Sequence, residues 1–513
     1  MEVFLDMAAK KLKIFIVAAE VAPFSEVGGL SQVMYFLPRA LMKLGHDVRM
    51  FTPKYGTLDE KRYPLKMDIE GLAVPTGEQE NPKRLICNVK GYDHGIRDPH
   101  VCFLENMEYF EKRSSVYGYN DDHIRFALLS RGALEALRRE KWIPDVIHAN
   151  DWHTAYLIND LRTRYVRNQR LYKVATLLSI HNLHQGVFDF GNASDLDFDD
   201  GKGELGSLFS ERFFKQNALK RGIIYADAIN TVSETYSREI MTEEFGAGID
   251  NLIKEVRTKV FGILNGLDYT EFDPKTDSFI KKNFSLATLE DRVANKADLQ
   301  KEFNLTVNPD IPVFAMIGRL DNQKGLDLVV DVLPFVLREY DIQFIAMGGG
   351  DPRYREFFLD LEKQYPKRVG THLMPNFTLP RKIFAGTDLL LLPSRWEPGG
   401  IVAVEGMRYG AVPLVRETGG LADSVSEFNL VSQEGTGFVF EQFHSLAFMG
   451  AITRALMVYR QPGLWKKLIR NCMRQDFSWE KVAQHYEDVY IRAIDFRRAL
   501  LKKSPHQAYR VEY

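Results

Sequence analysis

The run "LKIFIVAAEVAPFSEVGGL", residues 12–30, decides the fold class of this chain. Its first half is mostly apolar, which is typical of a strand buried in a sheet. A loop follows that ends in Gly28 and Gly29, and apolar residues then recur with helical spacing as far as Leu44. The next apolar run, "DVRMFTP" at residues 47–53, predicts a second strand. The segment is therefore a β-α-β unit, which indicates an α/β fold with a parallel sheet.

The same alternation of strands and helices continues through most of the chain. Strands that end in polar residues are predicted at 145–151, 174–182, 225–233, 311–320, 342–352 and 388–394. Residues 273–292 are polar and have few apolar anchors, so we interpret them as a linker. The last long helix is predicted at 479–501, with a basic, polar tail after it.

The predicted architecture is α/β, with two Rossmann-like domains facing each other across a cleft. We place the first domain at residues 10–272 and the second at residues 293–478, followed by the helix at 479–501. In parallel α/β sheets, ligands bind beyond the carboxyl ends of the strands, where the polar residues of this chain gather. Domain interfaces are common places for small-molecule sites, so the cleft is the expected site.

The composition is that of an ordinary globular protein. The 513 residues carry a net charge of -2, so no global field attracts nucleic acid or an anionic membrane. No apolar run reaches the roughly 18 residues that spanning a bilayer requires. The three cysteines, Cys87, Cys102 and Cys472, lack C-x-x-C spacing, so neither a disulfide framework nor a zinc site is predicted. We expect a cytoplasmic protein, because the reducing cytosol fits this cysteine usage.

Two loops offer groups that suit an anion. Gly28 and Gly29 precede a helix and let backbone amides approach an anion, although a tight strand-to-helix turn explains them equally well. Arg319 and Lys324 lie in "GRLDNQKG", residues 318–325, after a strand and before a helix. A planar guanidinium and a compact ammonium together suit a diphosphate, and their position at a strand end favours this function over two solvated cations.

Two histidine-containing loops follow strands of the first half. "HANDWHT" holds His148, Asp151 and His153, and "SIHNLHQG" holds His181 and His184. Metal binding is conceivable there, but the spacing matches no familiar ligand set, so we expect no metal. Hydrogen bonds to sugar hydroxyls suit these loops better. For His148, which adjoins the core of a strand, the alternative is a structural histidine with satisfied nitrogens.

Two carboxylates lie eight positions apart in "PSRWEPGGIVAVEG", residues 393–406. Glu397 precedes a helix that begins near Gly400, so it can accept hydrogen bonds from the vicinal hydroxyls of a sugar. The exposed amides at that helix start can neutralise a phosphate. Glu405 lies within the helix, three positions before Arg408, and an i,i+3 ion pair explains it as well as a functional role does.

A series of motifs along the chain resembles the bacterial glycogen synthase and plant starch synthase family. They include "DDHIRFALLS", "HANDWHTAYL", "SIHNLHQGVF", "NGLDYTEFDP", "GRLDNQKGLDL", "PSRWEPGGI" and "RETGGLADSV", and the match runs from about Leu12 to Ala493. The resemblance implies the GT-B fold, with the last helix crossing back to the first domain. It also implies retaining transfer of glucose from a nucleotide-glucose to the 4-hydroxyl at the non-reducing end of an α-1,4-glucan, without a metal or other cofactor.

The resemblance further implies roles for particular residues. Arg319 and Lys324 would hold the diphosphate of the donor, and the amides of Gly400 and Ile401 would hold its distal phosphate. Glu397 would bind the hydroxyls of glucose.

The remaining site residues come mostly from the first half of the chain. By the same resemblance, His153 and Asn265 would lie at the donor sugar, and Asp121 would lie near the acceptor. We group Gly28, Gly29 and Glu405 with the donor-binding residues.

Three positions depart from the family pattern. Glu26 stands where the family usually has lysine and Gln32 where it has aspartate, so a cation near the donor phosphates has become an anion. Pro375 replaces the aromatic residue that family members place against the nucleotide base, and Phe377 is the candidate substitute. ADP-glucose is the first expectation for the donor, and UDP-glucose is the second.

Three other functions stay open at this stage. A glucan phosphorylase can share two such domains, but it needs a lysine that carries pyridoxal phosphate, and no candidate stands out. Glu26 and Gln32 motivate a non-catalytic glucan-binding or regulatory protein. The third alternative is a GT-B transferase that acts on lipid or protein, although no basic-apolar membrane face is evident. The sequence indicates no particular oligomeric state.

Overall fold

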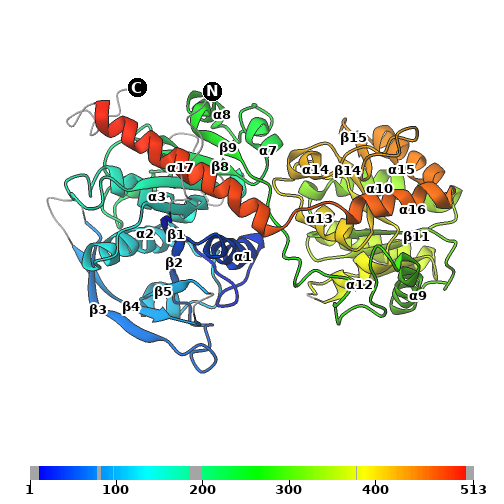
Figure 1. Ribbon diagram of the computed structural model, residues 1–513, viewed down its shortest axis with the longest axis horizontal. Coiled ribbons are helices and arrows are strands. Elements are labelled where there is room, and N and C mark those ends of the chain that lie inside the picture. Colours follow the sequence, from blue (N-terminus) through cyan, green and yellow to red (C-terminus); the bar gives the residue numbers. More distant parts are fainter. Residues whose placement is uncertain (1–10, 78–82, 96–97, 184–198, 377, 504–513) are drawn as a thin grey trace. The chain divides into compact units, whose positions relative to one another are not determined.

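Figure 1 shows the computed structural model of the chain, which describes residues 11–77, 83–95, 98–183, 199–376 and 378–503. The chain divides into two compact units. The first unit comprises residues up to 232, residues 237–263 and the segment from 479 onward, and the second comprises residues 233–236 and 264–478. Each unit is built on a sheet of its own.

The sheet of the first unit has the strand order β3-β4-β5-β2-β1-β6-β7-β8-β9 within the described residues. Strand β4 runs antiparallel to both β3 and β5, and every other neighbouring pair in this order is parallel. The strands are β1 (Lys13–Val17), β2 (Asp47–Pro53), β3 (Lys66–Pro75), β4 (Arg84–Tyr92), β5 (His100–Glu105), β6 (Val146–Asn150), β7 (Ala175–Ile180), β8 (Ala228–Thr231) and β9 (Val260–Gly262). Strand β1 is buried from Ile14 onward, as expected for a strand covered on both faces.

Helices flank this sheet, and the last helix of the chain belongs to the same unit (Figure 1). The described helices are α1 (Gly29–Lys43), η1 (Met107–Glu111), α2 (Asp122–Arg139), α3 (Asp151–Arg162), α5 (Glu211–Phe214), α6 (Ala218–Tyr225), α7 (Glu234–Glu239), which begins in residues grouped with the second unit, α8 (Asp250–Glu255), η2 (Arg257–Lys259) and α17 (Trp479–Lys503). Helix α17 buries Trp479, Tyr486 and Tyr490 in the core of the first unit. Helix α17 therefore packs in the first unit, although it follows the second unit in the sequence.

The second unit has an all-parallel sheet with the order β12-β11-β10-β13-β14-β15. The strands are β10 (Val313–Ile317), β11 (Gln343–Met347), β12 (Val369–His372), β13 (Leu389–Leu392), β14 (Val412–Arg416) and β15 (Phe438–Phe440). The helices are η3 (Leu289–Asp291), α9 (Arg292–Glu302), η4 (Asn322–Lys324), α10 (Leu326–Glu339), α11 (Pro352–Gln364), α12 (Leu379–Gly386), α13 (Ile401–Arg408), α14 (Gly419–Ser424), α15 (Ser445–Tyr459) and α16 (Pro462–Met473). Because all strands are parallel, their carboxyl ends share one edge of the sheet.

The segment 273–292 is not a linker, contrary to the sequence prediction. Its few apolar side chains, including Ile280, Phe284 and Leu289, are buried in the core of the second unit. Residues 264–272, which we placed in the first domain, also group with the second unit. A polar segment can be anchored by three well-placed apolar residues, and average polarity does not reveal this.

The antiparallel edge of the first sheet was not predicted either. Strand β3 is mostly exposed in its first half, so it lacks the apolar run that marks the parallel strands. Helix α1 continues past Pro38 to Lys43. Across the described ranges, no helix combines the length and the apolarity that crossing a bilayer requires.

Candidate active site

The centre of the candidate site in the second unit is a contact between Lys324 and Glu397. Lys324 Nζ lies 2.6 Å from Glu397 Oε2, and Ser394 Oγ donates a hydrogen bond of 2.9 Å to the same oxygen. Lys324 follows β10 and Glu397 follows β13, and these strands are neighbours in the sheet. The parallel topology therefore brings together two residues that are 73 positions apart in sequence.

Glycine lets the two loops of this site approach each other. Gly325 has φ +68°, and a Cβ atom there would lie 1.9 Å from the carbonyl oxygen of Pro393. Gly419 has φ +45°, and a Cβ atom there would lie 2.1 Å from the carbonyl oxygen of Glu397. Both positions require a left-handed backbone and leave no room for a side chain, so the loop around Glu397 is held by backbone packing.

Arg319 lies in the same loop as Lys324 but is bound more loosely. Its Nη2 donates to Gln323 Oε1 at 2.7 Å, and its Nη1 lies 3.3 Å from Asp321 Oδ2, while 58% of the side chain is exposed. The backbone carbonyl of Gln323 in turn accepts a hydrogen bond of 2.8 Å from the amide of Arg395. The guanidinium is thus available to an anionic ligand at the carboxyl end of β10.

Helix α13 begins beside Glu397. Gly400 is its N-cap residue with φ +62°, and no side chain of the described residues caps this end of the helix. The first amides of a helix carry partial positive charge and need acceptors from outside the helix. A phosphate oxygen is a suitable acceptor for the amides of Gly400 and Ile401.

Glu405 does not form the i,i+3 ion pair with Arg408 that we considered. Arg408 Nη2 lies 3.1 Å from Asp273 Oδ1 instead, and its guanidinium lies 4.4 Å from the centre of the Tyr269 ring. Desolvation by burial raises the pKa of Glu405 to about 8, opposed by the charge of Arg381 and assisted by that of Glu271. A carboxyl group that stays protonated at neutral pH can donate a hydrogen bond, which is compatible with a ligand-binding role.

Replacing Glu405 with glutamine is expected to stabilise the protein more at about pH 8 than at about pH 5. Between the ordinary pKa of 4.5 and the folded-state pKa of about 8, the folded state holds a proton that the unfolded state has released. The stability that Glu405 contributes is therefore present below the ordinary pKa and lost as the pH rises towards 8, whereas glutamine does not titrate. Urea midpoints of both proteins at both pH values check this, and an equal difference at the two would contradict it.

In the first unit, the anion position that we expected at Gly28 is occupied by a carboxylate of the protein itself. Glu20 Oε2 accepts hydrogen bonds from the amides of Val27 at 2.7 Å and Gly28 at 3.2 Å. Glu20 is buried, and desolvation raises its pKa. Glu26 and Gly29 are exposed beside it. Our sequence reasoning missed Glu20, although its place at the end of the first buried strand is the signal that identifies the other polar candidates.

The histidines of the first unit differ in their surroundings. His148 is fully buried, with its Nδ1 at 2.9 Å from Tyr490 Oη and its Nε2 at 2.6 Å from Ser179 Oγ. Both ring nitrogens therefore have hydrogen-bond partners. His148 is a structural histidine, which was the alternative considered from the sequence, and neither nitrogen is available to a metal. His153 is stacked on Trp152, and its buried Nδ1 has no hydrogen-bond partner in the part of the chain that the structure describes. Its pKa is lowered to about 3 by desolvation, so it is a neutral imidazole with one free acceptor or donor.

The loop around Asp151 joins the two histidine motifs. Asp151 has φ +54°, unusual for a residue other than glycine, and its Oδ1 accepts a hydrogen bond of 2.7 Å from the amide of His181. Desolvation raises the pKa of Asp151 to about 7. Strained backbone and a perturbed pKa often accompany functional sites, which favours this loop as part of one. His184 lies outside the described residues.

Two further predicted site residues have distinct environments. Asp121 Oδ2 lies 2.7 Å from Arg113 Nη2 in the first unit, so its charge is balanced before any ligand binds. Asn265, at the start of the 264–478 segment of the second unit, has a buried side-chain oxygen with no hydrogen-bond partner among the described residues. Of the two residues considered for the nucleotide base, Pro375 lies in the loop after β12, and Phe377 lies outside the described residues.

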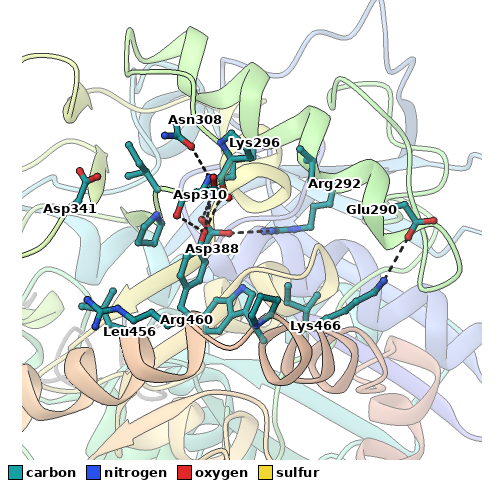
Figure 2. Close-up of a pocket in the computed structure, with 18 of the residues that line it drawn as sticks. Glu290, Arg292, Lys296, Asn308, Asp310, Asp341, Asp388, Leu456, Arg460 and Lys466 are labelled. Carbon is teal, nitrogen blue, oxygen red and sulfur yellow. Dashed lines mark hydrogen bonds and ion pairs between the residues drawn. The ribbon is translucent and has the colours of Figure 1, made fainter.

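A cavity of about 730 Å³ lies at the opposite edge of the second sheet (Figure 2). Pro312 and Asp388, which directly precede β10 and β13, are among the residues that line it. Asp388 Oδ2 lies 2.8 Å from Lys296 Nζ, and its Oδ1 lies 3.8 Å from Arg292 Nη1. These charged groups are buried and paired, so we assign them to the scaffold of the unit.

Comparison with known proteins shows the family of this chain. A family model described as starch synthase catalytic domain matches residues 13–255, and one described as glycosyl transferases group 1 matches residues 299–467. The glycogen synthase of Clostridium beijerinckii is 40% identical over 495 residues, which covers 93% of this chain and 98% of that protein. The chain belongs to the glycogen synthase and starch synthase family. The glycogen synthase of Geobacillus stearothermophilus is 37% identical over 500 residues and covers 96% of this chain and 99% of its own.

Solved structures agree with membership of the glycogen synthase and starch synthase family. The catalytic domain of starch synthase IV from Arabidopsis thaliana, bound to ADP and acarbose, has a TM-score of 0.81 and 30% identity, and covers 94% of this chain and 100% of that one. Sucrose-phosphate synthase from Thermosynechococcus elongatus has a TM-score of 0.57 and 18% identity, and covers 96% of this chain and 100% of that one, so it shows the fold alone. The fold is the GT-B type of two α/β units, and the protein is a glycosyltransferase of the glycogen synthase type.

Proposed function

We propose that this enzyme transfers glucose, with retention of configuration, from ADP-glucose to the 4-hydroxyl at the non-reducing end of an α-1,4-glucan. The observation that carries the proposal is the pairing of Lys324 with Glu397 at the carboxyl ends of β10 and β13, beside the uncapped start of α13. This arrangement offers a cation, a carboxylate and free amides within one loop cluster of the second unit. Such a set matches the phosphates and the sugar of a nucleotide-glucose.

The cations act on the leaving group. As the bond between the anomeric carbon and the diphosphate weakens, negative charge grows on the diphosphate. Lys324 and Arg319 stabilise that charge, and the amides of Gly400 and Ile401 hold the distal phosphate. These groups need not gain or lose a proton during the reaction, so they are effective over a wide pH range. Electrostatic stabilisation of this kind is the main source of the rate enhancement that we propose.

Two tasks remain, which are to bind the glucose and to accept the proton of the acceptor hydroxyl. Glu397 accepts hydrogen bonds from glucose hydroxyls, and its contact with Lys324 holds the carboxylate in position. No second carboxylate needs to act as a base, because the leaving phosphate can take the proton of the acceptor hydroxyl. We propose that Glu405, which lies in α13 about one turn after Ile401, also contributes to binding of the donor.

In the first unit, we assign the glucose-facing role to His153, whose buried Nδ1 lacks a partner in the described residues. In the second unit, Asn265 has a side-chain oxygen that is likewise unsatisfied among the described residues, and a hydroxyl donor of the sugar would satisfy it. The amide of Gly28 already donates to Glu20, so of the two expected glycines Gly29 is the one that we assign to the donor through its backbone. Asp121 is assigned to the acceptor glucan, with Arg113 as its counter-charge.

The choice of ADP-glucose over UDP-glucose is supported by the starch synthase IV structure, which was solved with ADP. That protein was also solved with acarbose, which supports a glucan as the acceptor class here. UDP-glucose is the second candidate donor, since Pro375 provides no aromatic face for the base.

The test is an assay of nucleotide release with purified full-length protein, glycogen and either ADP-glucose or UDP-glucose. We expect nucleotide release and glucose incorporation in equal amounts, with a higher kcat/KM for ADP-glucose. A higher kcat/KM for UDP-glucose would overturn the donor assignment alone. Glycogen binding without release from either donor would instead identify a non-catalytic glucan-binding protein, the function that exposed Glu26 motivates.

A further inference from the structure

Three potential metal ligands converge on the antiparallel edge of the first unit. Asp68 of β3 and His100 and Cys102 of β5 each contribute one ligand atom, and these atoms all lie within 4.8 Å of one another. The three strands of this edge, β3, β4 and β5, are drawn in blue and blue-green in Figure 1. Carboxylate oxygen, imidazole nitrogen and thiolate sulfur together form a ligand set that zinc accepts.

The strand geometry builds this convergence. His100 and Cys102 are two positions apart on one strand, so their side chains point to the same face. Gly91 of β4 lies directly opposite Cys102 in the antiparallel register. Asp68 falls at an irregularity in the pairing of β3 with β4, between Met67 and Ile69, which is where a bulge can redirect a side chain.

Gly91 keeps the space between the ligands open. A Cβ atom at this position would lie 2.1 Å from Asp68 Oδ2 and 2.8 Å from His100 Cε1. Any side chain there would push the carboxylate and the imidazole apart. The absence of a side chain at Gly91 is therefore a requirement of the cluster.

A second carboxylate orients the imidazole. Asp93 Oδ1 lies 2.7 Å from His100 Nδ1, while His100 Nε2 lies 3.2 Å from Asp68 Oδ2. Histidines that bind metals usually have one nitrogen held by such a carboxylate, which fixes the ring and makes the other nitrogen a better ligand. The Asp93–His100 contact has this form.

We infer that Asp68, His100 and Cys102 form a zinc site in which water fills the fourth position. Zinc–ligand bonds of 2.0–2.3 Å place tetrahedral ligands about 3.5 Å apart. His100 Nε2 and Asp68 Oδ2, 3.2 Å apart, already suit this spacing, and no other separation, at up to 4.8 Å, needs to close by more than roughly 1 Å. On binding, the S–H bond of Cys102 breaks, an S–Zn bond forms and the proton passes to the solvent. The ligands come from two different strands that are not adjacent, which is why cysteine spacing alone did not predict the site.

The site ties the outermost strand of the sheet to β5. Strand β3 is at the end of the strand order and pairs with β4 only, and a zinc ion would add a link from β3 across β4. The role is structural, and it involves none of the residues proposed to bind the donor or the acceptor. The inference is therefore independent of the proposed function.

The test is a zinc titration of the tag-free, full-length protein after treatment with a chelator, followed by competition with a chromogenic zinc indicator. We expect one zinc ion per chain, and at least tenfold weaker binding in Asp68→Asn, His100→Gln and Cys102→Ser. Asp68 and His100 are partly exposed, with 30% and 25% of their side chains accessible, so their variants are expected to fold. Cobalt substitution should give a thiolate charge-transfer absorption that Cys102→Ser abolishes.

The matched control is Cys87→Ser, which removes a buried thiol from the adjacent strand β4. Cys87 Sγ accepts from Asn106 Nδ2 at 3.7 Å and is outside the cluster. This variant should bind zinc as the wild type does and keep the cobalt absorption. Failure of the wild type to bind a stoichiometric zinc ion, or equal affinity in Asp68→Asn and His100→Gln, would overturn the inference.

Discussion

Replacing Lys324 with alanine is expected to lower the rate of glucosyl transfer at least tenfold, which corresponds to about 1.4 kcal/mol of barrier. The side chain is 17% exposed and its ammonium contacts Glu397 directly. Its removal takes away a charge that stabilises the leaving diphosphate and, among the described residues, leaves Glu397 with Ser394 as its side-chain partner. Because the charge on the diphosphate grows towards the transition state, the loss should appear in kcat as well as in kcat/KM.

Glu397→Ala is expected to have an effect of the same size, because it removes the carboxylate that holds the sugar. The two residues act as a unit, so their effects should not be independent. The fold-loss of rate in the double variant should therefore be smaller than the product of the two single fold-losses, and close to that of either single variant. Initial rates with ADP-glucose and glycogen measure all three variants. The control is Lys363→Ala, whose ammonium is on α11, with 77% of the side chain exposed and only a local contact with Asp360 at 3.1 Å. Near-normal rates in both single variants would contradict the site assignment.

Replacing Asp388 with alanine is expected to destabilise the second unit by about 3–5 kcal/mol, because it breaks a buried ion-pair network. Asp388 Oδ2 accepts from Lys296 Nζ at 2.8 Å and from the amide of Val313 at 2.8 Å, and Asp388 also faces Arg292 (Figure 2). Without Asp388, two buried cations lose their carboxylate counter-charge and keep only uncharged oxygen acceptors such as the carbonyls of Pro309 and Tyr409 among the described residues, and the amide of Val313 loses its side-chain acceptor. Buried charges without partners are among the most costly defects in a folded protein.

Thermal unfolding measures the effect of Asp388→Ala. For a unit of this size, the loss corresponds to a fall in Tm of roughly 6–20 °C. The matched control is Asp360→Ala, which removes an aspartate with 75% of its side chain exposed, and which should stay within about 0.5 kcal/mol of the wild type. A shift in Asp388→Ala as small as that of the control would show that the network does not stabilise the unit.

The sequence predicts those parts of the fold that depend on local patterns. The β1-α1-β2 unit follows from an apolar run and from helical spacing after Gly29, and both are properties of neighbouring residues. The hairpin of β3 and β4 does not follow, because β3 lies at an edge and its outer residues are exposed. Residues 273–292 were misassigned for a related reason, since the burial of Phe284 depends on a core formed elsewhere in the chain.

The candidate site was predicted as a set of residues and not as a set of contacts. Lys324 and Glu397 were each identified from their loops, but their contact depends on β10 and β13 being neighbours, and strand order is not encoded in periodicity. The amides near Gly28 were expected to bind an anionic ligand, whereas in the structure the amide of Gly28 donates to Glu20 of the same chain. An ion pair between Arg408 and Glu405 was considered from their spacing. In the structure Arg408 pairs with Asp273 instead, which is 135 positions away in the sequence.

The central claim is that the loop cluster around Lys324 and Glu397 holds the nucleotide-glucose, and a crystal structure with bound ADP-glucose tests it most directly. The account predicts the diphosphate within hydrogen-bonding distance of Lys324 Nζ and of the amides of Gly400 and Ile401, with glucose hydroxyls on Glu397. A donor bound away from the carboxyl ends of β10 and β13, with Lys324 and Glu397 still paired only to each other, would contradict it.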